Sequence, residues 1–250
     1  MHWLHDWFAT AAGHELARAE TRWLSRRLAG LYARRVLQIG AYGSGCCPAV
    51  FGDARQWIMD DWPGGPIDLR ANAEVIPLAS ASVDVVILVH QLEFAEHPHQ
   101  VIREAARVLA PEGHMLVVNF NPVSLWGLGK LLKRGRGQPP WCGQYFTANR
   151  LADWMLLLGL TPTAREGMAL LPPALHRGLH RVRGSRLAYS HGLSPGLRWC
   201  GGVNLMVGQK RVNGRATPSG HWHRRFELIH GGLGQATGAG ARRNANRNVL

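Results

Sequence analysis

A strand–helix–strand segment near the middle of the chain constrains the fold more than any other feature. It opens with VDVVILVH (Val83–His90), which is almost wholly apolar and β-branched, as in a strand that is covered on both faces. Apolar residues at helical spacing follow, and Pro98 suits the first turn of that helix. Pro111 and Gly113 are expected to end the helix before a strand at His114–Val118. This order forms a crossover unit of a parallel sheet, so the sequence predicts an α/β fold.

The same alternation extends over most of the chain and divides it into three parts. Residues 1–34 have apolar spacing that predicts one or two amphipathic helices, and residues 35–210 form the α/β domain. Residues 211–250 are dominated by Gly, Asn and Arg, a composition typical of disorder. Within the domain we expect further strands at Val36–Ile39, Arg55–Asp61, Ile67–Arg70, Thr161–Glu166 and Val203–Lys210, and a helix at Ala148–Leu158.

The charge balance favours anionic partners without dictating a fold. The chain has 29 Lys and Arg against 16 acids, a formal net charge of +13, and residues 211–250 hold seven Arg and one acid. RNA is therefore a candidate partner through this basic tail. The segment SLWGLGKLLKRGRG (Ser124–Gly137) could be a lid, a membrane-surface helix or a nucleic-acid contact, but an amphipathic helix that packs on the core is the favoured interpretation.

Several classes of protein are disfavoured by what the sequence lacks. The four cysteines show neither a disulfide framework nor zinc spacing, and no secretory leader is recognisable, so we expect a cytoplasmic protein. No apolar segment reaches the ~18 residues of a membrane span, so no integral membrane segment is expected. His176 and His180 have helical spacing without a nearby Glu, and His221 and His223 lie in the basic tail, so we expect no metal site.

The stretch NAEVIPLASASVDVVILVHQLEFAEHPHQVIREAARVLAPEGHMLVV resembles the class I S-adenosylmethionine-dependent methyltransferases, a family that includes small-molecule enzymes of the ubiquinone-biosynthesis type. The resemblance implies a Rossmann-like, seven-stranded and mostly parallel sheet, with helices on both faces and an antiparallel last strand. It also implies S-adenosylmethionine as cofactor and a small molecule as the most expected methyl acceptor. The order and spacing of these matches carry it: Asn72-Ala73-Glu74, Ile76-Pro77-Leu78, Val83-Asp84-Val85-Val86, Glu104, Arg107-Val108-Leu109 and Pro111-Glu112-Gly113.

The resemblance also assigns a cofactor loop to the glycine-rich end of VLQIGAYGSG, which follows the predicted strand Val36–Ile39. Gly40, Gly43 and Gly45 would let the backbone approach the methionyl part of the cofactor. Tyr42 would have to point away or pack over the cofactor. Gln38 stands where the family has an acid, so it offers hydrogen bonds without a negative charge. A plain turn after a strand is the alternative.

Polar residues at the next two strand ends complete the expected cofactor site. Asp60 is placed to accept hydrogen bonds from ribose hydroxyls, and Asp61 is the alternative for this role. Asn72 occupies the position of an acid that meets the adenine amino group, although it could equally shape a turn. Ala73 would lie near the adenine edge.

His90 ends the central strand and is the one candidate catalytic residue. It could contact the cofactor or act as a base toward the acceptor, and a polar strand terminus is the alternative. Glu93 and His97 are weaker candidates in the same region. A cofactor-binding protein without full activity and an RNA-binding protein on the same fold stay open as rival functions.

Overall fold

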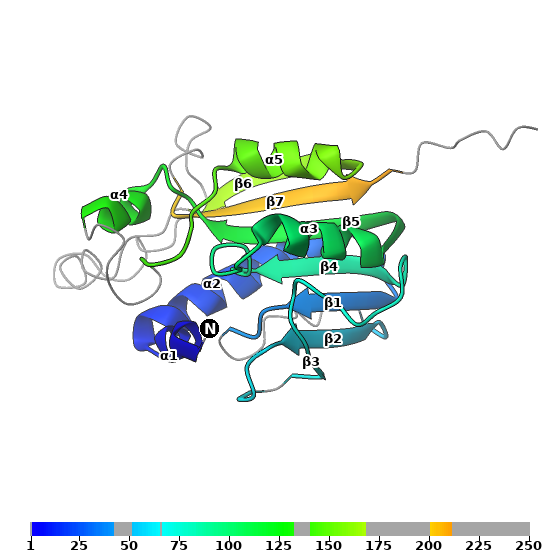
Figure 1. The fold of residues 1–250 in the computed structure, drawn as a ribbon, viewed down its shortest axis with the longest axis horizontal. Coiled ribbons are helices and arrows are strands. Elements are labelled where there is room, and N and C mark those ends of the chain that lie inside the picture. The colour runs from blue at the N-terminus through cyan, green and yellow to red at the C-terminus, as the bar shows by residue number, and fades with distance from the viewer. Residues whose placement is uncertain (1, 43–51, 66, 133–140, 169–200, 212–250) are drawn as a thin grey trace, which may run out of the picture. The chain divides into compact units, whose positions relative to one another are not determined.

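The computed structural model describes residues 2–42, 52–65, 67–132, 141–168 and 201–211, which contain a seven-stranded sheet of order β3-β2-β1-β4-β5-β7-β6 (Figure 1). β1 to β5 are parallel, and β7 runs antiparallel to both β5 and β6. The α/β fold and the antiparallel last strand are thus confirmed. The strands are β1 Arg35–Ile39, β2 Arg55–Asp60, β3 Leu69–Arg70, β4 Val83–Val89, β5 Leu109–Phe120, β6 Leu160–Met168 and β7 Val203–Lys210; the helices are α1 His2–Phe8, α2 Ala11–Leu28, α3 Pro98–Val108, α4 Leu125–Leu132 and α5 Ala148–Leu157.

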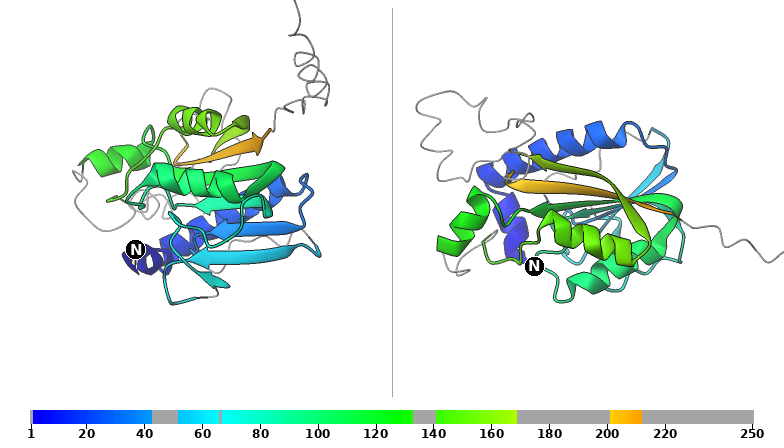
Figure 2. Two further views of the ribbon diagram at one scale, coloured as in Figure 1. Left: turned by 45° about the vertical axis from the view of Figure 1, so that its right-hand side comes forward. Right: turned by 90° about the horizontal axis from the view of Figure 1, so that it is seen from above.

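The sheet lies between two layers of helices, which divide the core into two apolar clusters. Along β4, Val85, Ile87 and Val89 face the cluster that holds the apolar side of α2. Val86 and Leu88 face the opposite cluster, which holds α3 and α5. Figure 2 shows α2 on the opposite side of the sheet from α3 and α5. The almost uninterrupted apolar run of β4 therefore fits its burial on both faces.

The end of α3 differs slightly from the sequence-based prediction. The helix ends at Val108, and Leu109 is already extended, with φ −70° and ψ 128°. Proline disfavours the helical conformation of the residue before it, here Ala110, so the helix has to end upstream of Pro111. β5 consequently begins at Leu109, and its pairing with β4 shifts register between Val83 and Val85.

A tight corner joins α1 to α2. Thr10 caps α2 by accepting a hydrogen bond from the Gly13 backbone N–H at 3.2 Å. A Cβ at Gly13 would lie 2.4 Å from the Phe8 Cα and from the Trp7 carbonyl oxygen, so only glycine allows the two helices to meet this closely. The corner places α1 beside the carboxyl ends of the parallel strands (Figure 1).

A buried ionic triad ties α2 to the carboxyl end of β4. His90 has a φ of 48°, and its Nε2 lies 2.8 Å from Glu20 Oε1 while its Nδ1 lies 2.9 Å from Glu93 Oε1. All three side chains have no exposed surface. Burial by itself lowers the pKa of His90, but the charges and hydrogen bonds of the two carboxylates outweigh it and raise the pKa to about 10. The imidazole is therefore a buried cation at neutral pH.

Several sequence-based predictions concern residues outside the described ranges. These residues are Gly43, Gly45, both candidate histidine pairs, and the tail from residue 212. In α4, Trp126 is buried and stacks on Phe120 and Trp141, which agrees with a helix that packs on the core. Across the described helices, none is both long and apolar enough to cross a membrane.

Removing the charge of His90 should destabilise the protein strongly. In His90→Phe, Glu20 and Glu93 would be left as buried carboxylates without their cation, and we expect the free energy of unfolding to fall by about 3–5 kcal/mol. Urea denaturation followed by circular dichroism measures this change. The double variant His90→Phe/Glu20→Leu should recover part of the loss, whereas a loss below about 1 kcal/mol in the single variant would show that the triad carries little stability.

The triad should also shape the dependence of stability on pH. Because the pKa of His90 is about 10 in the fold and 6.5 in a model compound, its stabilising contribution is complete below pH 6.5 and is lost as the pH rises toward 10. The stability difference between the wild type and His90→Phe should therefore be largest near pH 6 and shrink steadily up to pH 10. A difference that stays constant over this range would contradict a buried histidinium.

Candidate functional site

A cavity of about 160 Å³ lies where the parallel strands end. Asp60 and Asp61 reach it from the end of β2, and Ile39 from the end of β1. Residues 71–74, which follow β3, form a second wall. The remaining lining residues come from the segment after β4 and from α3: Gln91, Phe94, Ala95, Glu96 and Val101. In a parallel sheet this edge is where ligands bind, so the cavity is the first candidate for a site.

The turn after β1 approaches its neighbours so closely that it excludes any side chain at Gly40. Gly40 has a φ of +100°, and its N–H donates to the Met59 carbonyl at 2.9 Å. A Cβ there would lie 2.5 Å from the Val89 carbonyl oxygen and 2.8 Å from Gln91 Nε2. Glycine is therefore required at this corner for both its conformation and its size.

Asp60 is fixed by two backbone donors and braces this corner from β2. Its Oδ2 accepts from the Ala41 backbone N–H at 2.7 Å, and its Oδ1 accepts from the Trp62 N–H at 3.1 Å. His5 Nε2 from α1 lies 3.4 Å from the same Oδ1. Burial raises the pKa of Asp60, but these hydrogen bonds outweigh it and keep the pKa below its usual value. The carboxylate is ionised, and its lone pairs are largely occupied.

Asp61, Asn72 and Ala73 border the cavity in different ways. Asp61 is exposed, and partial burial together with the neighbouring carboxylate of Asp60 raises its pKa. Asn72 Oδ1 accepts a hydrogen bond from the Glu74 N–H at 2.8 Å, which is the turn-forming role that the sequence offered as an alternative. Asn72 also lines the cavity. Ala73 is largely buried against the apolar side of the cavity. The structure thus gathers the residues expected at the ends of β2 and β3.

Tyr42 lies outside this wall and packs against α1. Its ring stacks on Phe8 at 5.1 Å between centroids and contacts His5 at 4.7 Å, and its hydroxyl accepts from Gln91 Nε2 at 3.1 Å. Burial, followed by the charge of Asp60, raises its pKa well above the ordinary value. Gln38 is also buried, and its amide donates to the Gly40 carbonyl at 2.7 Å. Both unusual residues of the loop therefore support the corner itself.

His90 does not line the cavity either. Both of its ring nitrogens are engaged by carboxylates, and the ring stacks on Phe120 at 4.2 Å. A general base needs a ring nitrogen with a free lone pair. In this arrangement the imidazole is protonated and both of its nitrogens are hydrogen-bonded to carboxylates, so it has none. Sequence reasoning also missed His5, whose ring stacks on Trp62 at 4.1 Å beside Asp60. Its only signal was its position in an amphipathic helix.

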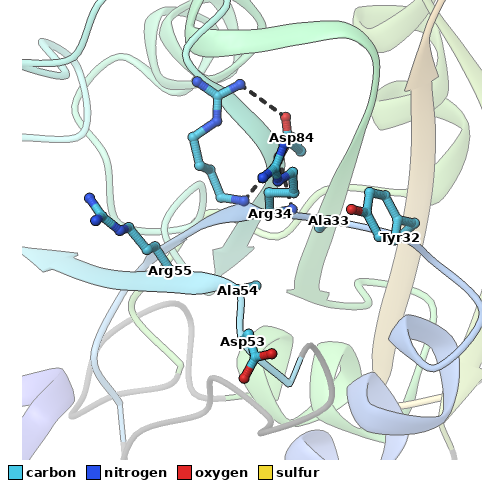
Figure 3. A pocket seen from close by; sticks show the side chains of 8 residues that line it. Tyr32, Ala33, Arg34, Asp53, Ala54, Arg55 and Asp84 are labelled. Carbon is cyan, nitrogen blue, oxygen red and sulfur yellow. Dashed lines mark hydrogen bonds and ion pairs between the residues drawn. The ribbon is translucent and has the colours of Figure 1, made fainter.

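Size alone does not identify the site. A larger cavity of about 800 Å³ opens at the opposite edge of the sheet, among the residues that lead into β1 and β2 (Figure 3). It contains none of the residues that the sequence predicted to bind the cofactor or to act in catalysis. Among the described residues, no three His, Cys, Asp or Glu side chains are grouped so that they could hold a metal ion.

Comparisons with known proteins find a methyltransferase domain in this part of the chain. Residues 30–117 match the family described as "Methyltransferase domain", and this range contains Gly40, Asp60, Asn72 and His90. The uncharacterized protein YafS of Escherichia coli is 34% identical over 149 residues, which are 60% of this chain and 57% of YafS. The chain thus spans less than two thirds of the length of that relative.

Two solved structures share the fold. A possible histamine N-methyltransferase from Thermotoga maritima superposes with a TM-score of 0.58 at 15% identity, over 84% of this chain and 99% of its own. The N-methyltransferase NodS from Bradyrhizobium japonicum, solved with S-adenosyl-L-homocysteine, gives a TM-score of 0.52 at 13% identity, over 81% of this chain and 94% of its own. Residues 30–117 thus match a methyltransferase domain, and the chain shares the fold of these two methyltransferase structures.

Proposed function

We propose that this chain transfers a methyl group from S-adenosylmethionine to an acceptor, and that the cavity at the carboxyl edge holds the adenosine part of the cofactor. The observation that supports this most directly is the meeting of Asp61 and Asn72 with the apolar Ile39 and Val101 around one cavity. Such a wall offers hydrogen bonds to the edge of a nucleoside and apolar contact to the faces of its base.

The residues present fit the nucleoside in chemistry, although the cavity has to widen for it. Carboxylate oxygens accept hydrogen bonds from ribose hydroxyls, and an amide oxygen accepts from an adenine amino group. At about 160 Å³ the cavity is smaller than the roughly 300 Å³ at which ligand pockets usually begin. Because Gly40 has no side chain, the backbone of the corner is bare at this position. The methionyl part of the cofactor needs such a bare backbone to approach it closely.

Asp61 is the stronger candidate for the ribose hydroxyls. The oxygens of Asp60 already accept from the Ala41 and Trp62 backbones, so we assign Asp60 to hold the corner. The bound cofactor would supply an activated methyl group on its sulfonium. What this chain has to provide is alignment of the acceptor and exclusion of water, and neither requires a catalytic triad or a metal ion.

The acceptor is proposed to be a small molecule that binds between α1 and the ends of β4 and β5. Aromatic side chains gather there, with Trp3 in edge contact with Phe94 and with Phe120 stacked on Tyr145. We assign His90 a positioning role, because its two hydrogen bonds fix Glu20 and Glu93 beneath this region. The cytoplasm stays the predicted location.

A cofactor-binding protein without transferase activity is the second candidate. Gln38 is neutral where the family carries an acid, and the side chain of Tyr42 packs into the core beside the glycine corner. The two candidates differ in turnover: both would bind S-adenosylmethionine, but only the enzyme would release S-adenosylhomocysteine when it is incubated with a metabolite extract.

Substitutions at the cavity should separate cofactor binding from stability. We expect Asp61→Asn to weaken S-adenosylmethionine binding about tenfold or more, because it removes charged hydrogen bonds, and Asn72→Ala to weaken it about threefold to tenfold. Isothermal titration calorimetry measures both effects. Asp153→Asn on the exposed side of α5 is the matched control and should bind like the wild type. Unchanged binding in Asp61→Asn and Asn72→Ala would place the adenosine elsewhere.

A further inference from the structure

The amino-terminal edge of the sheet carries a second surface that the methyltransferase site does not use. The cavity of about 800 Å³ there is lined by Tyr32, Arg34 and Arg35 before and at the start of β1, and by Asp53 and Arg55 before and at the start of β2. Figure 3 shows these side chains on the two chain segments that lead into the sheet. They lie at the opposite ends of β1 and β2 from Gly40 and Asp60.

The charges of this cavity are not all compensated. Arg35 pairs with Asp84 at 3.2 Å, and both oxygens of Asp84 are occupied, because Oδ2 also accepts from the Arg34 and Arg35 backbones. Burial raises the pKa of Asp84, but these bonds outweigh it and lower the pKa, so the pair is locked as ions. Within the described part of the chain, no acid pairs with the guanidinium of Arg34 or Arg55.

α2 continues this surface with three more arginines on one face. Arg18, Arg22 and Arg26 are all exposed, and their spacing of four residues places them about 6 Å apart along the helix. The Nε of Arg22 donates to the Arg18 carbonyl and that of Arg26 to the Arg22 carbonyl, each at 3.2 Å. The guanidinium groups of Arg22 and Arg26 are thereby anchored to the helix through Nε, which leaves their terminal nitrogens for a ligand.

We propose that these five residues, Arg18, Arg22, Arg26, Arg34 and Arg55, form a basic track that binds single-stranded nucleic acid. α2 ends at Leu28, and the chain then enters β1 at Arg35, so the helix leads to the edge where the cavity opens. The five cations outnumber the carboxylates beside them, which are Asp53 in the cavity and Glu15 on α2, since Asp84 is already paired with Arg35. Regularly repeated cations suit the regularly repeated phosphates of a polynucleotide.

Tyr32 adds a feature that favours nucleic acid over a free phosphate. Its side chain is 87% exposed at the mouth of the cavity, beside Arg34. An exposed ring next to phosphate-binding cations is the arrangement on which an unpaired base stacks.

A lipid surface fits the track less well. Amphipathic helices that bind membranes insert an apolar face, but the apolar face of α2 is buried against the sheet, including Leu16, Trp23, Leu24 and Leu28. The other exposed large apolar side chains among the described residues lie on different segments, such as Leu125, Leu128 and Leu131 on α4. The track therefore offers charge without an apolar surface to insert.

The test measures binding of a fluorescein-labelled oligouridylate of about twelve nucleotides to the full chain by fluorescence anisotropy. In Arg22→Gln/Arg34→Gln/Arg55→Gln, we expect about tenfold weaker binding at 50 mM salt. The slope of log Kd against log salt should fall by about 2, since each lost phosphate contact on a single strand contributes roughly 0.7. The matched control is Arg103→Gln/Arg150→Gln/Arg211→Gln, which removes three exposed arginines elsewhere and keeps the net charge equal.

Further variants separate stacking, overall charge and lipid binding. Tyr32→Ala should weaken binding about fivefold, and Tyr32→Phe should keep it. The proposal is overturned if the control triple variant loses as much affinity as the track variant, or if the track variant loses binding to phosphatidylserine vesicles but not to the oligonucleotide. S-adenosylmethionine titration of the same variants should stay unchanged, so failure of this proposal is distinct from failure of the proposed methyl transfer.

Discussion

Burial of β4 on both faces is the constraint from which the rest of the structure follows. Val85, Ile87 and Val89 require an apolar layer on one side, and Val86 and Leu88 require another on the opposite side. Helices can satisfy both only if the chain crosses over the sheet between parallel strands. The crossovers in turn bring the carboxyl ends of β1, β2 and β4 to one edge, where α1 contacts Asp60 through His5 and His90 through Phe8.

The polar groups at this edge form a support as much as a site. Asp60 holds the corner after β1, Gln38 bonds the Gly40 carbonyl, and His90 joins α2 to β4 through two carboxylates. Each is buried and hydrogen-bonded, which explains how the corner after β1 keeps its conformation up to Tyr42 without the usual acid. The exposed groups that remain, Asp61 and the outer side of Asn72, are those left for a ligand. In the proposed function, structural and binding roles are divided between neighbouring residues.

The fold was predictable because the decisive signals are local in the sequence. Three signals can be recognised without coordinates: the apolar run of β4, the apolar face of α3, and the sequence motifs from Asn72 onward that resemble the family. The predicted strand bounds agree with the structure within a few residues. The partners of single polar residues were not readable. Glu20 lies 70 positions from His90, and His5 lies 55 positions before Asp60, so only the tertiary fold brings these pairs together. A histidine at a strand end indicated chemistry, yet its surroundings made it a buried cation.

The contact between α1 and Asp60 has a consequence for how any ligand enters. His5 lies 3.4 Å from the Asp60 carboxylate and stacks on Trp62, so a ligand group that approaches that carboxylate oxygen has to displace the His5 side chain. His5 and the ligand would then compete for the same oxygen of Asp60. The apparent dissociation constant of such a ligand is the intrinsic constant divided by the fraction of molecules in which His5 of α1 has already moved away from Asp60. Mutations in α1 would therefore change the affinity for that ligand.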